Sequence, residues 1–208
     1  YSLLFLFSEG IGAVRDPNGF RPLFLGKKET PDTSVTGTSY YFASETCAFD
    51  ILGAEVVEEV DPGQGYFIDE DGIETFRISE DKTWGMCSFE PIYFSRPDSL
   101  YNGRSIHKTR VEMGEALWEE HPVDADIVTG VPDSANSAIQ GVADASGLPY
   151  EITVIRSHYT GRTFISPYQS MRDLKVRKKF NLVPDTVEGN RVVLVDDSIV
   201  RGTTMKNI

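Results

Sequence analysis

Residues Val192–Thr204 read V-V-L-V-D-D-S-I-V-R-G-T-T, an apolar run followed by two carboxylates and a turn that contains a glycine. The apolar run Val192–Val195 predicts a strand buried on both faces, the kind found in parallel sheets. Ligands of open α/β sheets bind beyond the carboxyl ends of the strands, which is where Asp196 and Asp197 stand. The stretch therefore predicts an α/β fold, built on an open and mostly parallel sheet, with a binding site at this edge.

The turn after this strand carries groups suited to a sugar phosphate. Two adjacent carboxylates can accept hydrogen bonds from vicinal ribose hydroxyls and can hold Mg²⁺ directly or through water. Gly202 lets the backbone approach a ligand closely, and a helix that began here would aim its N-terminal amides at a 5′-phosphate. The residues expected to hold that phosphate are Ser198, Ile199, Val200, Arg201, Gly202, Thr203 and Thr204. The alternative is a solvated Asp-Asp turn that only caps a helix.

Helices and strands alternate along the chain before this motif. A helix is predicted over Ile106–Glu120, where charges separate apolar residues at helical spacing, namely Val111, Met113, Ala116 and Leu117. A second helix is predicted over Ser134–Ala145, with Gly147 and Pro149 as stop signals. The remaining predicted elements are the strands Ile127–Val131 and Glu151–Ile155 and the helix Met171–Phe180. This order predicts a parallel sheet with helices on its faces.

The earlier part of the chain is β-rich, with turn signals such as Asp16-Pro17-Asn18-Gly19 between short apolar runs. The predicted strands are Ser2–Phe7, Ile11–Val14, Leu23–Gly26, Tyr40–Ala43, Gly65–Ile68 and Thr75–Ile78, with one helix at Cys47–Leu52. The run Leu3–Phe7 is too short to span a membrane and lacks the basic flank of a signal peptide, so we expect a buried strand. The predicted domains are residues 1–88 and 89–208.

The net charge of −12 narrows the choice of partner. Nucleic acid and anionic membranes recruit Lys and Arg, so neither is expected to bind. A small phosphate ligand is allowed, because backbone amides, one or two Arg and a divalent cation can hold it. Cys47 and Cys87 resemble no disulfide framework, so a cytoplasmic location is expected. The chain starts without Met and stops just after the turn motif, so we expect a fragment of a longer protein.

The motif at Val192–Thr204 resembles the phosphoribosyl-pyrophosphate (PRPP) motif of type I phosphoribosyltransferases. Its sequence most resembles that of the glutamine PRPP amidotransferase family. In that family, Arg15–Leu23 and Ser44–Asp50 resemble the late glutaminase domain, Cys87–Ser99 the inter-domain junction, and Tyr159–Pro167 the mobile active-site loop. The resemblance covers nearly the whole chain. It implies part of an Ntn-hydrolase-type α+β domain followed by part of a type I phosphoribosyltransferase domain.

The resemblance also makes Val131–Ala135, V-P-D-S-A, the pyrophosphate loop. Pro132, Asp133 and Ser134 would then bind substrate, and Ser134 matches a position that can ligate Mg²⁺. The alternative is that Ser134 is only a helix N-cap. The metal ligands implied together are Ser134, Asp196 and Asp197.

The stretch from Arg156 to Pro167 could fold over a bound pyrophosphate and exclude water. Arg156 and Tyr159 are expected to bind substrate, and Arg162 is expected to act with the two carboxylates as a catalytic residue. Where the family pattern is Lys-Asn-Arg-Tyr, this chain has Arg156-Ser157-His158-Tyr159, so the second basic position becomes His158. The alternatives are a surface histidine for His158 and a surface salt bridge for Arg162.

Some members of the family carry a [4Fe–4S] cluster, and Cys87 matches one of its four cysteine positions. The alternative is that Cys87 is a small buried hydrophobe, since a cluster needs four thiolates. Both interpretations stay open at this point. The basic run Lys175–Lys179 is interpreted as a solvated helix face, with binding of a feedback nucleotide as the alternative.

The reaction implied by the resemblance is the attack of ammonia on PRPP, which forms 5-phosphoribosylamine and releases pyrophosphate at the entry to purine synthesis. Glutamine would supply the ammonia, nucleotides would act as feedback inhibitors, and a homo-oligomer is expected. Two rivals share the Asp-Asp loop: a nucleobase-salvage phosphoribosyltransferase and a non-catalytic PRPP-sensing regulator. Neither accounts for R-D-P-N-G-F-R-P-L at Arg15–Leu23.

Overall fold

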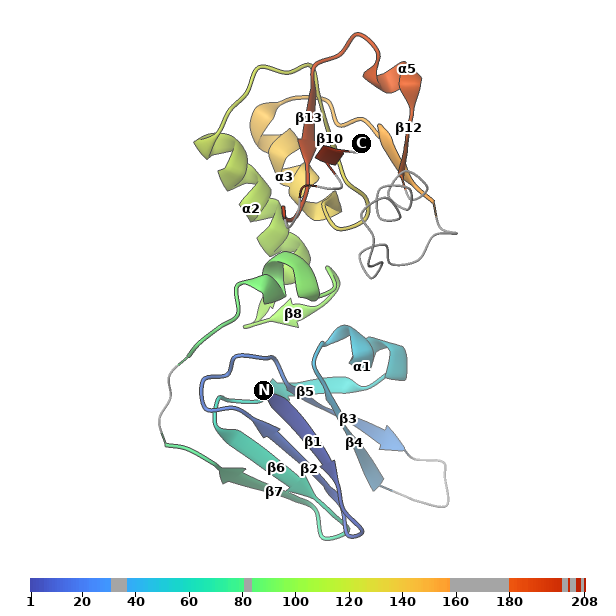
Figure 1. Ribbon diagram of the computed structural model, residues 1–208. Coiled ribbons are helices and arrows are strands. Elements are labelled where there is room, and N and C mark those ends of the chain that lie inside the picture. The colour runs from blue at the N-terminus through green and yellow to red at the C-terminus, as the bar shows by residue number, and fades with distance from the viewer. Residues whose placement is uncertain (31–36, 81–83, 158–179, 200–201, 203–204, 207) are drawn as a thin grey trace, which may run out of the picture. The chain divides into compact units, whose positions relative to one another are not determined.

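The computed structural model describes residues 1–30, 37–80, 84–157, 180–199, 202, 205–206 and 208 (Figure 1). The chain forms two compact units, Tyr1–Ile106 and His107–Ile208. None of the helices in these described ranges has the length and apolar character needed to cross a membrane.

Among the described residues, the main part of the first unit consists of two antiparallel sheets and a short helix, α1 (Cys47–Leu52). One sheet has the order β1 (Ser2–Leu6), β2 (Ile11–Arg15), β6 (Gln64–Ile68), β7 (Ile73–Arg77); the other has the order β4 (Gly37–Ala43), β3 (Phe24–Thr30), β5 (Glu55–Glu59). Gly53 ends α1 at φ 60°, a left-handed conformation that glycine adopts without strain. The six predicted strands form with shifted ends and the helix forms with its predicted bounds, whereas β5 has no predicted counterpart.

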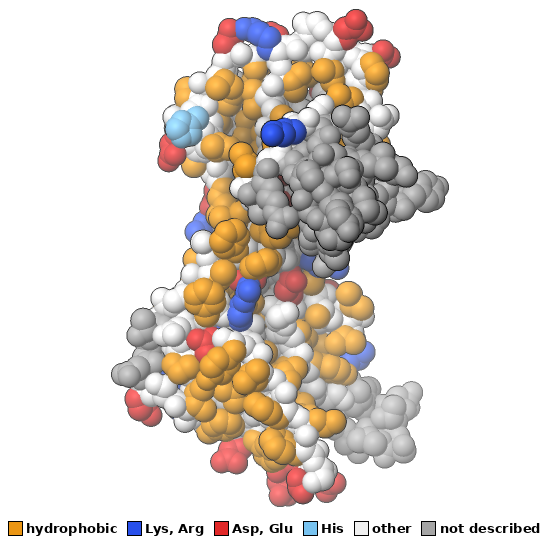
Figure 2. Space-filling view, in the orientation of Figure 1, with side chains coloured by type: hydrophobic (Ala, Val, Ile, Leu, Met, Phe, Trp, Pro, Cys, Tyr) orange, Lys and Arg blue, Asp and Glu red, His pale blue; other side chains and the backbone are white. Residues whose placement is uncertain are grey.

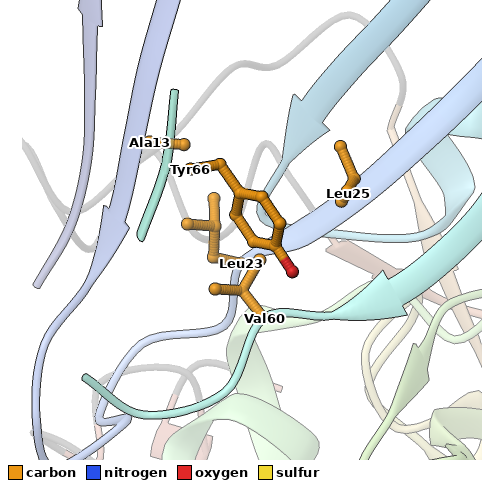
Figure 3. Close-up of a cluster of buried hydrophobic side chains, with 5 residues drawn as sticks. All are labelled: Ala13, Leu23, Leu25, Val60 and Tyr66. Carbon is orange, nitrogen blue, oxygen red and sulfur yellow. The ribbon is translucent and has the colours of Figure 1, made fainter. Parts of the chain in front are cut away.

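The main core of the first unit receives side chains from both sheets (Figure 3). Ala13 of β2 and Tyr66 of β6 come from one sheet, and Leu25 of β3 from the other; Leu23 and Val60 complete the cluster. Successive side chains of a strand point to opposite faces. Phe24 therefore packs into a second cluster, with Phe49, Tyr101 and Ile106.

Strand β1 forms as predicted, but the expectation that it is buried was wrong. Leu4 is 59% exposed and Leu6 is 86% exposed. β1 is the edge strand of its sheet and, within the described residues, pairs only with β2. Figure 2 shows hydrophobic side chains gathered on the surface of this unit. Hydrophobicity indicated the strand correctly, but burial depends on what packs against it.

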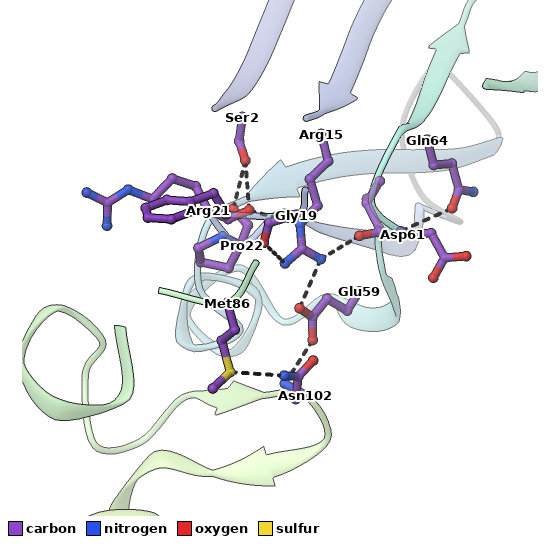
Figure 4. Close-up of polar contacts among 12 residues, drawn as sticks. Ser2, Arg15, Gly19, Arg21, Pro22, Glu59, Asp61, Gln64, Met86 and Asn102 are labelled. Atoms are coloured by element: carbon purple, nitrogen blue, oxygen red, sulfur yellow. Dashed lines mark hydrogen bonds and ion pairs between the residues drawn. The ribbon is translucent and has the colours of Figure 1, made fainter. Parts of the chain in front are cut away.

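Fully buried Arg15 ties the end of β2 to the loop before β3 and to the end of β5 (Figure 4). Its Nε donates to the Arg21 carbonyl at 2.9 Å, and Nη2 donates to the Gly19 carbonyl at 3.0 Å. Nη1 donates to the Glu59 carboxylate at 3.0 Å and to the Val60 carbonyl at 2.6 Å. Each of the three guanidinium nitrogens thus donates at least one hydrogen bond, which offsets the burial of the charge.

Three small elements near the end of the first unit have no predicted counterpart. They are the π-helix η1 (Glu90–Phe94) and the hairpin strands β8 (Leu100–Tyr101) and β9 (Arg104–Ser105). Glu90 of η1 is buried and forms an ion pair with Arg21, whose guanidinium lies 4.7 Å from the ring centroid of Phe94. This pairing ties η1 to the loop before β3.

Two side chains that precede α1 hold the hairpin segment in place. The Glu45 carboxylate accepts hydrogen bonds from the Arg96 N–H at 2.6 Å and from the Ser99 hydroxyl at 3.0 Å. The Thr46 hydroxyl accepts one from the Leu100 N–H at 2.8 Å. The segment between η1 and β9 is therefore part of the first unit.

The second unit contains the predicted parallel pair (Figure 1). β10 (Ile127–Gly130) and β13 (Val192–Val195) run parallel, with Gly130 opposite Val195. Val195 is buried, but the other three residues of β13 are only partly so, which corrects the prediction of a strand buried on both faces. The parallel direction, which decides where the site lies, is confirmed.

An exposed ion pair fixes the register at the start of these two strands. The Arg191 N–H and Nε both donate to Asp126 Oδ2, at 2.8 and 3.0 Å, and the Asp126 N–H donates to the Arg191 carbonyl at 2.9 Å. The side-chain hydrogen bond from Arg191, followed by the backbone one, lowers the pKa of Asp126 to about 2. This ion pair lies at the start of β10 and β13, whereas the predicted binding loops follow the ends of these strands.

The other elements of this part are α2 (Ile106–Glu120), α3 (Asn136–Ser146), β11 (Val154–Arg156), β12 (Phe180–Leu182) and α5 (Pro184–Val187). β11 and β12 pair antiparallel. Gly147 ends α3 at φ 71°, as its position predicted. The helix predicted over Met171–Phe180 lies outside the described residues except for Phe180, which starts β12 and is not helical.

Helix α2 has the predicted bounds, but the prediction of its apolar face was wrong. Met113 and Leu117 are exposed, whereas Ile106, Arg110 and Gly114 are buried at four-residue spacing. A Cβ at Gly114 would lie 2.0 Å from the Ala138 carbonyl oxygen, so α2 and α3 approach each other closely there. The buried face of α2 is defined by a glycine contact and a buried arginine.

Candidate functional site

Two loops meet at the carboxyl edge of the parallel pair. Gly130 and Val195 end their strands opposite each other. The Val131 N–H donates to the Val195 carbonyl at 2.9 Å, which extends the pairing into the first loop. Val131–Ala135 and the acidic pair after Val195 therefore leave the sheet side by side, as the sequence predicted.

The Asp196–Asp197 pair makes hydrogen bonds within its own loop. The Asp197 N–H donates to Asp196 Oδ1 at 3.0 Å, and the Ser198 hydroxyl donates to Asp197 Oδ1 at 2.6 Å. Both residues are partly exposed. Carboxylates at such a position can accept hydrogen bonds from a sugar or bind a metal.

The rest of the PRPP-like loop is open where it is described. Ile199 is 78% exposed. Gly202 has φ 64°, and a Cβ placed on it would meet no heavy atom of the described part of the chain within 4 Å. A left-handed φ favours glycine at this position. The predicted phosphate-binding residues Val200, Arg201, Thr203 and Thr204 lie outside the described residues.

The first loop carries the predicted pyrophosphate residues. Pro132 and Ser134 are partly buried, Asp133 is exposed, and the peptide between Pro132 and Asp133 is cis. The N-cap of α3 is Ala135, and no side chain caps the helix. Ser134 is therefore not the N-cap residue, which removes the structural alternative considered for it.

Strand β11 brings Arg156 to the same edge. The Glu151 N–H donates to the Val128 carbonyl at 3.0 Å, and the Thr153 hydroxyl donates to the Thr129 hydroxyl at 3.0 Å, so this segment runs beside β10 in the same direction. Arg156, at the end of β11, donates from Nη1 to Asp133 Oδ2. Sequence reasoning named both residues as ligands but missed their pairing.

The buried Thr129–Thr153 pair, which sets this alignment, was also missed from the sequence. Thr129 and Thr153 are 2% and 1% exposed, and their hydroxyls form a hydrogen bond with each other. Nothing in the local sequence signals such a pair, because the partners are far apart along the chain. Tyr159, Arg162, His158 and Lys175–Lys179 lie outside the described residues, so their predicted roles stay predictions.

The described residues contain no group of three His, Cys, Asp or Glu side chains that could hold a metal ion. Asp196, Asp197 and Ser134 supply oxygen atoms, the donor type that Mg²⁺ prefers, but they leave most of its ligands to water or substrate. Cys87 is buried and free, and so is Cys47. The chain has two cysteines, so its residues alone do not fit a [4Fe–4S] cluster, which needs four thiolates.

Comparison with known proteins gives these loops a context. All 208 residues align with the amidophosphoribosyltransferase of Bacillus subtilis at 47% identity, and cover 42% of that protein. From end to end, the chain resembles amidophosphoribosyltransferases. Those of Synechocystis and Archaeoglobus fulgidus are 48% and 45% identical over the whole of this chain. No protein-family model matches the chain.

Two solved structures have the same fold as this chain. A glutamine PRPP amidotransferase from B. subtilis, complexed with ADP and GMP, matches with a TM-score of 0.86 and 46% identity, over 100% of this chain and 44% of that one. A structure described as the allosteric regulatory enzyme of purine biosynthesis matches with a TM-score of 0.85. The resemblance inferred from the motifs is confirmed. The chain spans about two fifths of the length of these amidophosphoribosyltransferases.

Proposed function

We propose that the complete protein is an amidophosphoribosyltransferase, which converts PRPP, glutamine and water to 5-phosphoribosylamine, pyrophosphate and glutamate. The observation that carries the proposal is the parallel register of β10 and β13, which puts Val131–Ala135 and the Asp196-Asp197 pair at one sheet edge. The identity of 47% across the chain supports the same enzyme class. The reaction would be the first step of purine synthesis.

On this proposal the chain carries parts of two domains, with residues 1–88 in an Ntn-type glutaminase domain and 89–208 in a type I phosphoribosyltransferase domain. The two antiparallel sheets of the first unit and the parallel pair of the second support two domains of different type. We assign no glutaminase residue in this chain. Glutamine hydrolysis would supply the ammonia, and the protein would work in the cytoplasm as a homo-oligomer.

The proposed chemistry is displacement at C1 of the ribose. Asp196 and Asp197 would accept hydrogen bonds from the ribose hydroxyls, and residues 198–204 would hold the 5′-phosphate. Ser134, Arg156 and Arg162 would take the leaving pyrophosphate, with Pro132, Asp133 and Tyr159 around it. Positioning and charge neutralisation then supply most of the catalysis. Mg²⁺ bound at Asp196, Asp197 and Ser134 would neutralise charge on the pyrophosphate.

Two further partners belong to the proposal. Nucleotides would act as feedback inhibitors, because the B. subtilis relative is complexed with ADP and GMP. A [4Fe–4S] cluster would use Cys87 as one ligand only, and three thiolates would come from outside this chain. An iron and sulfide assay of the complete protein, with and without Cys87→Ser, tests that assignment.

The first prediction tests the acidic pair. In the complete protein, Asp197→Asn should lower glutamine-dependent pyrophosphate release from PRPP by about 10- to 100-fold, because a charge-assisted contact to substrate and metal is lost. The matched control is Asp185→Asn on α5, an exposed residue outside the site, which should leave the rate unchanged. Unchanged PRPP affinity and turnover in Asp197→Asn would contradict the site assignment.

The same assay separates the proposal from its rivals. A salvage phosphoribosyltransferase would release pyrophosphate with a nucleobase and not with glutamine. A regulator would bind PRPP without releasing pyrophosphate. Either result with the unmodified protein would replace the proposed activity.

A further inference from the structure

The two charged residues that face each other at the carboxyl edge, Asp133 and Arg156, come from different strands. Asp133 lies in the loop after β10, and Arg156 is the last residue of β11. The buried Thr129–Thr153 hydrogen bond holds these two segments side by side. It therefore also brings Asp133 and Arg156 close together. The fold therefore places this ion pair at the edge of the site.

This ion pair is exposed enough to open. The side chains of Arg156 and Asp133 are 36% and 58% exposed. Pairs in such an environment contribute between about 0 and 1 kcal/mol, because water screens them. A pyrophosphate group carries more negative charge than one carboxylate, and the planar guanidinium can donate two parallel hydrogen bonds to it. Exchange of the carboxylate for a phosphate is thus favourable for the arginine.

A second feature of Arg156 is a hydrogen-bond donor without a described acceptor. Its Nε is buried and has no hydrogen-bond partner in the part of the chain that the structure describes. A buried donor left unpaired is unfavourable by about 1 to 3 kcal/mol. The carboxylate of Asp133 engages Nη1 and leaves Nε unpaired among the described residues, so this contact does not satisfy the whole guanidinium.

We propose that Asp133 holds Arg156 in the ligand-free site and competes with the pyrophosphate group of the substrate for it. This inference rests on the proposed function, since it assigns a regulatory contact within the same site. Asp133 is a competitor in this scheme: its carboxylate occupies the guanidinium until a diphosphate displaces it. Its carboxylate then faces solvent.

The test measures the affinity of the complete protein for inorganic pyrophosphate and for PRPP by calorimetry, with and without Mg²⁺. Asp133→Asn removes the competing charge and should tighten pyrophosphate binding by about two- to fivefold, the range expected for loss of an exposed ion pair. Asp133→Glu restores a carboxylate and should return the affinity toward that of the unmodified protein.

A double-mutant comparison distinguishes competition for Arg156 from a general charge effect. In an Arg156→Ala background, Asp133→Asn should leave the affinity unchanged, because the competed group is gone. A gain that persists in that background would mean simple repulsion between Asp133 and the ligand and would overturn the proposal. Asp144→Asn, an exposed carboxylate on α3, is the matched control for charge removal and should change nothing.

Two other results would also overturn the inference. Weaker binding in Asp133→Asn without Mg²⁺ would mean that Asp133 orders Arg156 for the ligand, and weaker binding only with Mg²⁺ would mean that Asp133 binds the metal. If the unmodified protein bound neither PRPP nor pyrophosphate, the proposed function itself would fail. Melting temperatures of all variants identify any loss caused by misfolding.

Discussion

At the scale of single residues, Arg15 shows how the first unit tolerates a charge in its core. Its guanidinium makes four hydrogen bonds, and three of the acceptors are main-chain carbonyls. Trp84 lies 5.6 Å from it, ring centroid to guanidinium carbon. Glu59, its one charged acceptor, also accepts from the Asn102 N–H at 2.9 Å. Arg15 thus connects β2, β5 and the hairpin segment through one side chain.

Replacing Arg15 by Met should lower the free energy of unfolding by about 3 to 5 kcal/mol, because Glu59 and three carbonyls would lose their buried donor. Urea unfolding followed by Trp fluorescence measures the change. Arg15→Lys keeps the charge but not the planar fork, so its free energy of unfolding should lie between those of the unmodified protein and Arg15→Met. The control is Arg96→Ala, since the pair between Arg96 and Asp98 is exposed and its loss should change stability by under about 1 kcal/mol. Equal effects in Arg15 and Arg96 variants would contradict this account.

At the scale of elements, two glycines let α2 and α3 pack backbone against backbone. A Cβ at Gly141 of α3 would lie 1.9 Å from the Val111 carbonyl oxygen, and Gly114 of α2 makes the reciprocal approach to α3. His107 Nδ1 and the Ser137 hydroxyl, 3.0 Å apart, link the first turns of the two helices. Because α3 follows the V-P-D-S-A loop directly, this crossing helps to position the site.

Gly141→Ala should therefore destabilise the second unit by about 1 to 3 kcal/mol, despite the gain in helix propensity that alanine brings. It should also weaken PRPP binding, because a shifted α3 moves Ser134. Thermal unfolding and PRPP titration measure the two effects. Gly37→Ala is the matched control, since a Cβ there would meet no atom within 4 Å. No loss of stability in Gly141→Ala would mean that the helices separate without cost.

The elements that sequence predicted well are those whose pattern is local. The apolar run of β13, the carboxylates after it and the stop signal at Gly147 each lie within a few residues. The apolar face of α2 was mispredicted because glycine and arginine carry no hydrophobic signal, although they form its buried face. The Asp133–Arg156 pair could not be predicted because it depends on the alignment of two strands. Its residues were found by motif, and their contact only by structure.

At the scale of the whole molecule, the chain contains two compact units that meet in sequence at Ile106 and His107. The motif at Cys87–Ser99 led us to predict domains of 1–88 and 89–208, and that division stays a proposal. The contacts of Glu45, Thr46 and Glu59 instead connect the hairpin segment to the first unit. The two alternatives differ in which unit protects the amides between η1 and α2.

Hydrogen exchange can decide between them, because amides of one cooperative unit open together. In Gly141→Ala, which weakens the second unit, the amides of Val128 and Val131 should exchange faster by the factor that matches the lost stability. The amides of Leu100 and Asn102, which bond to Thr46 and Glu59, should keep their protection. If they exchange faster in step with Val128, the hairpin segment unfolds with the second unit and its boundary lies near residue 88. Protection that stays constant places the cooperative boundary at the start of α2, where the fully buried Ile106 packs against Phe24 and Phe49.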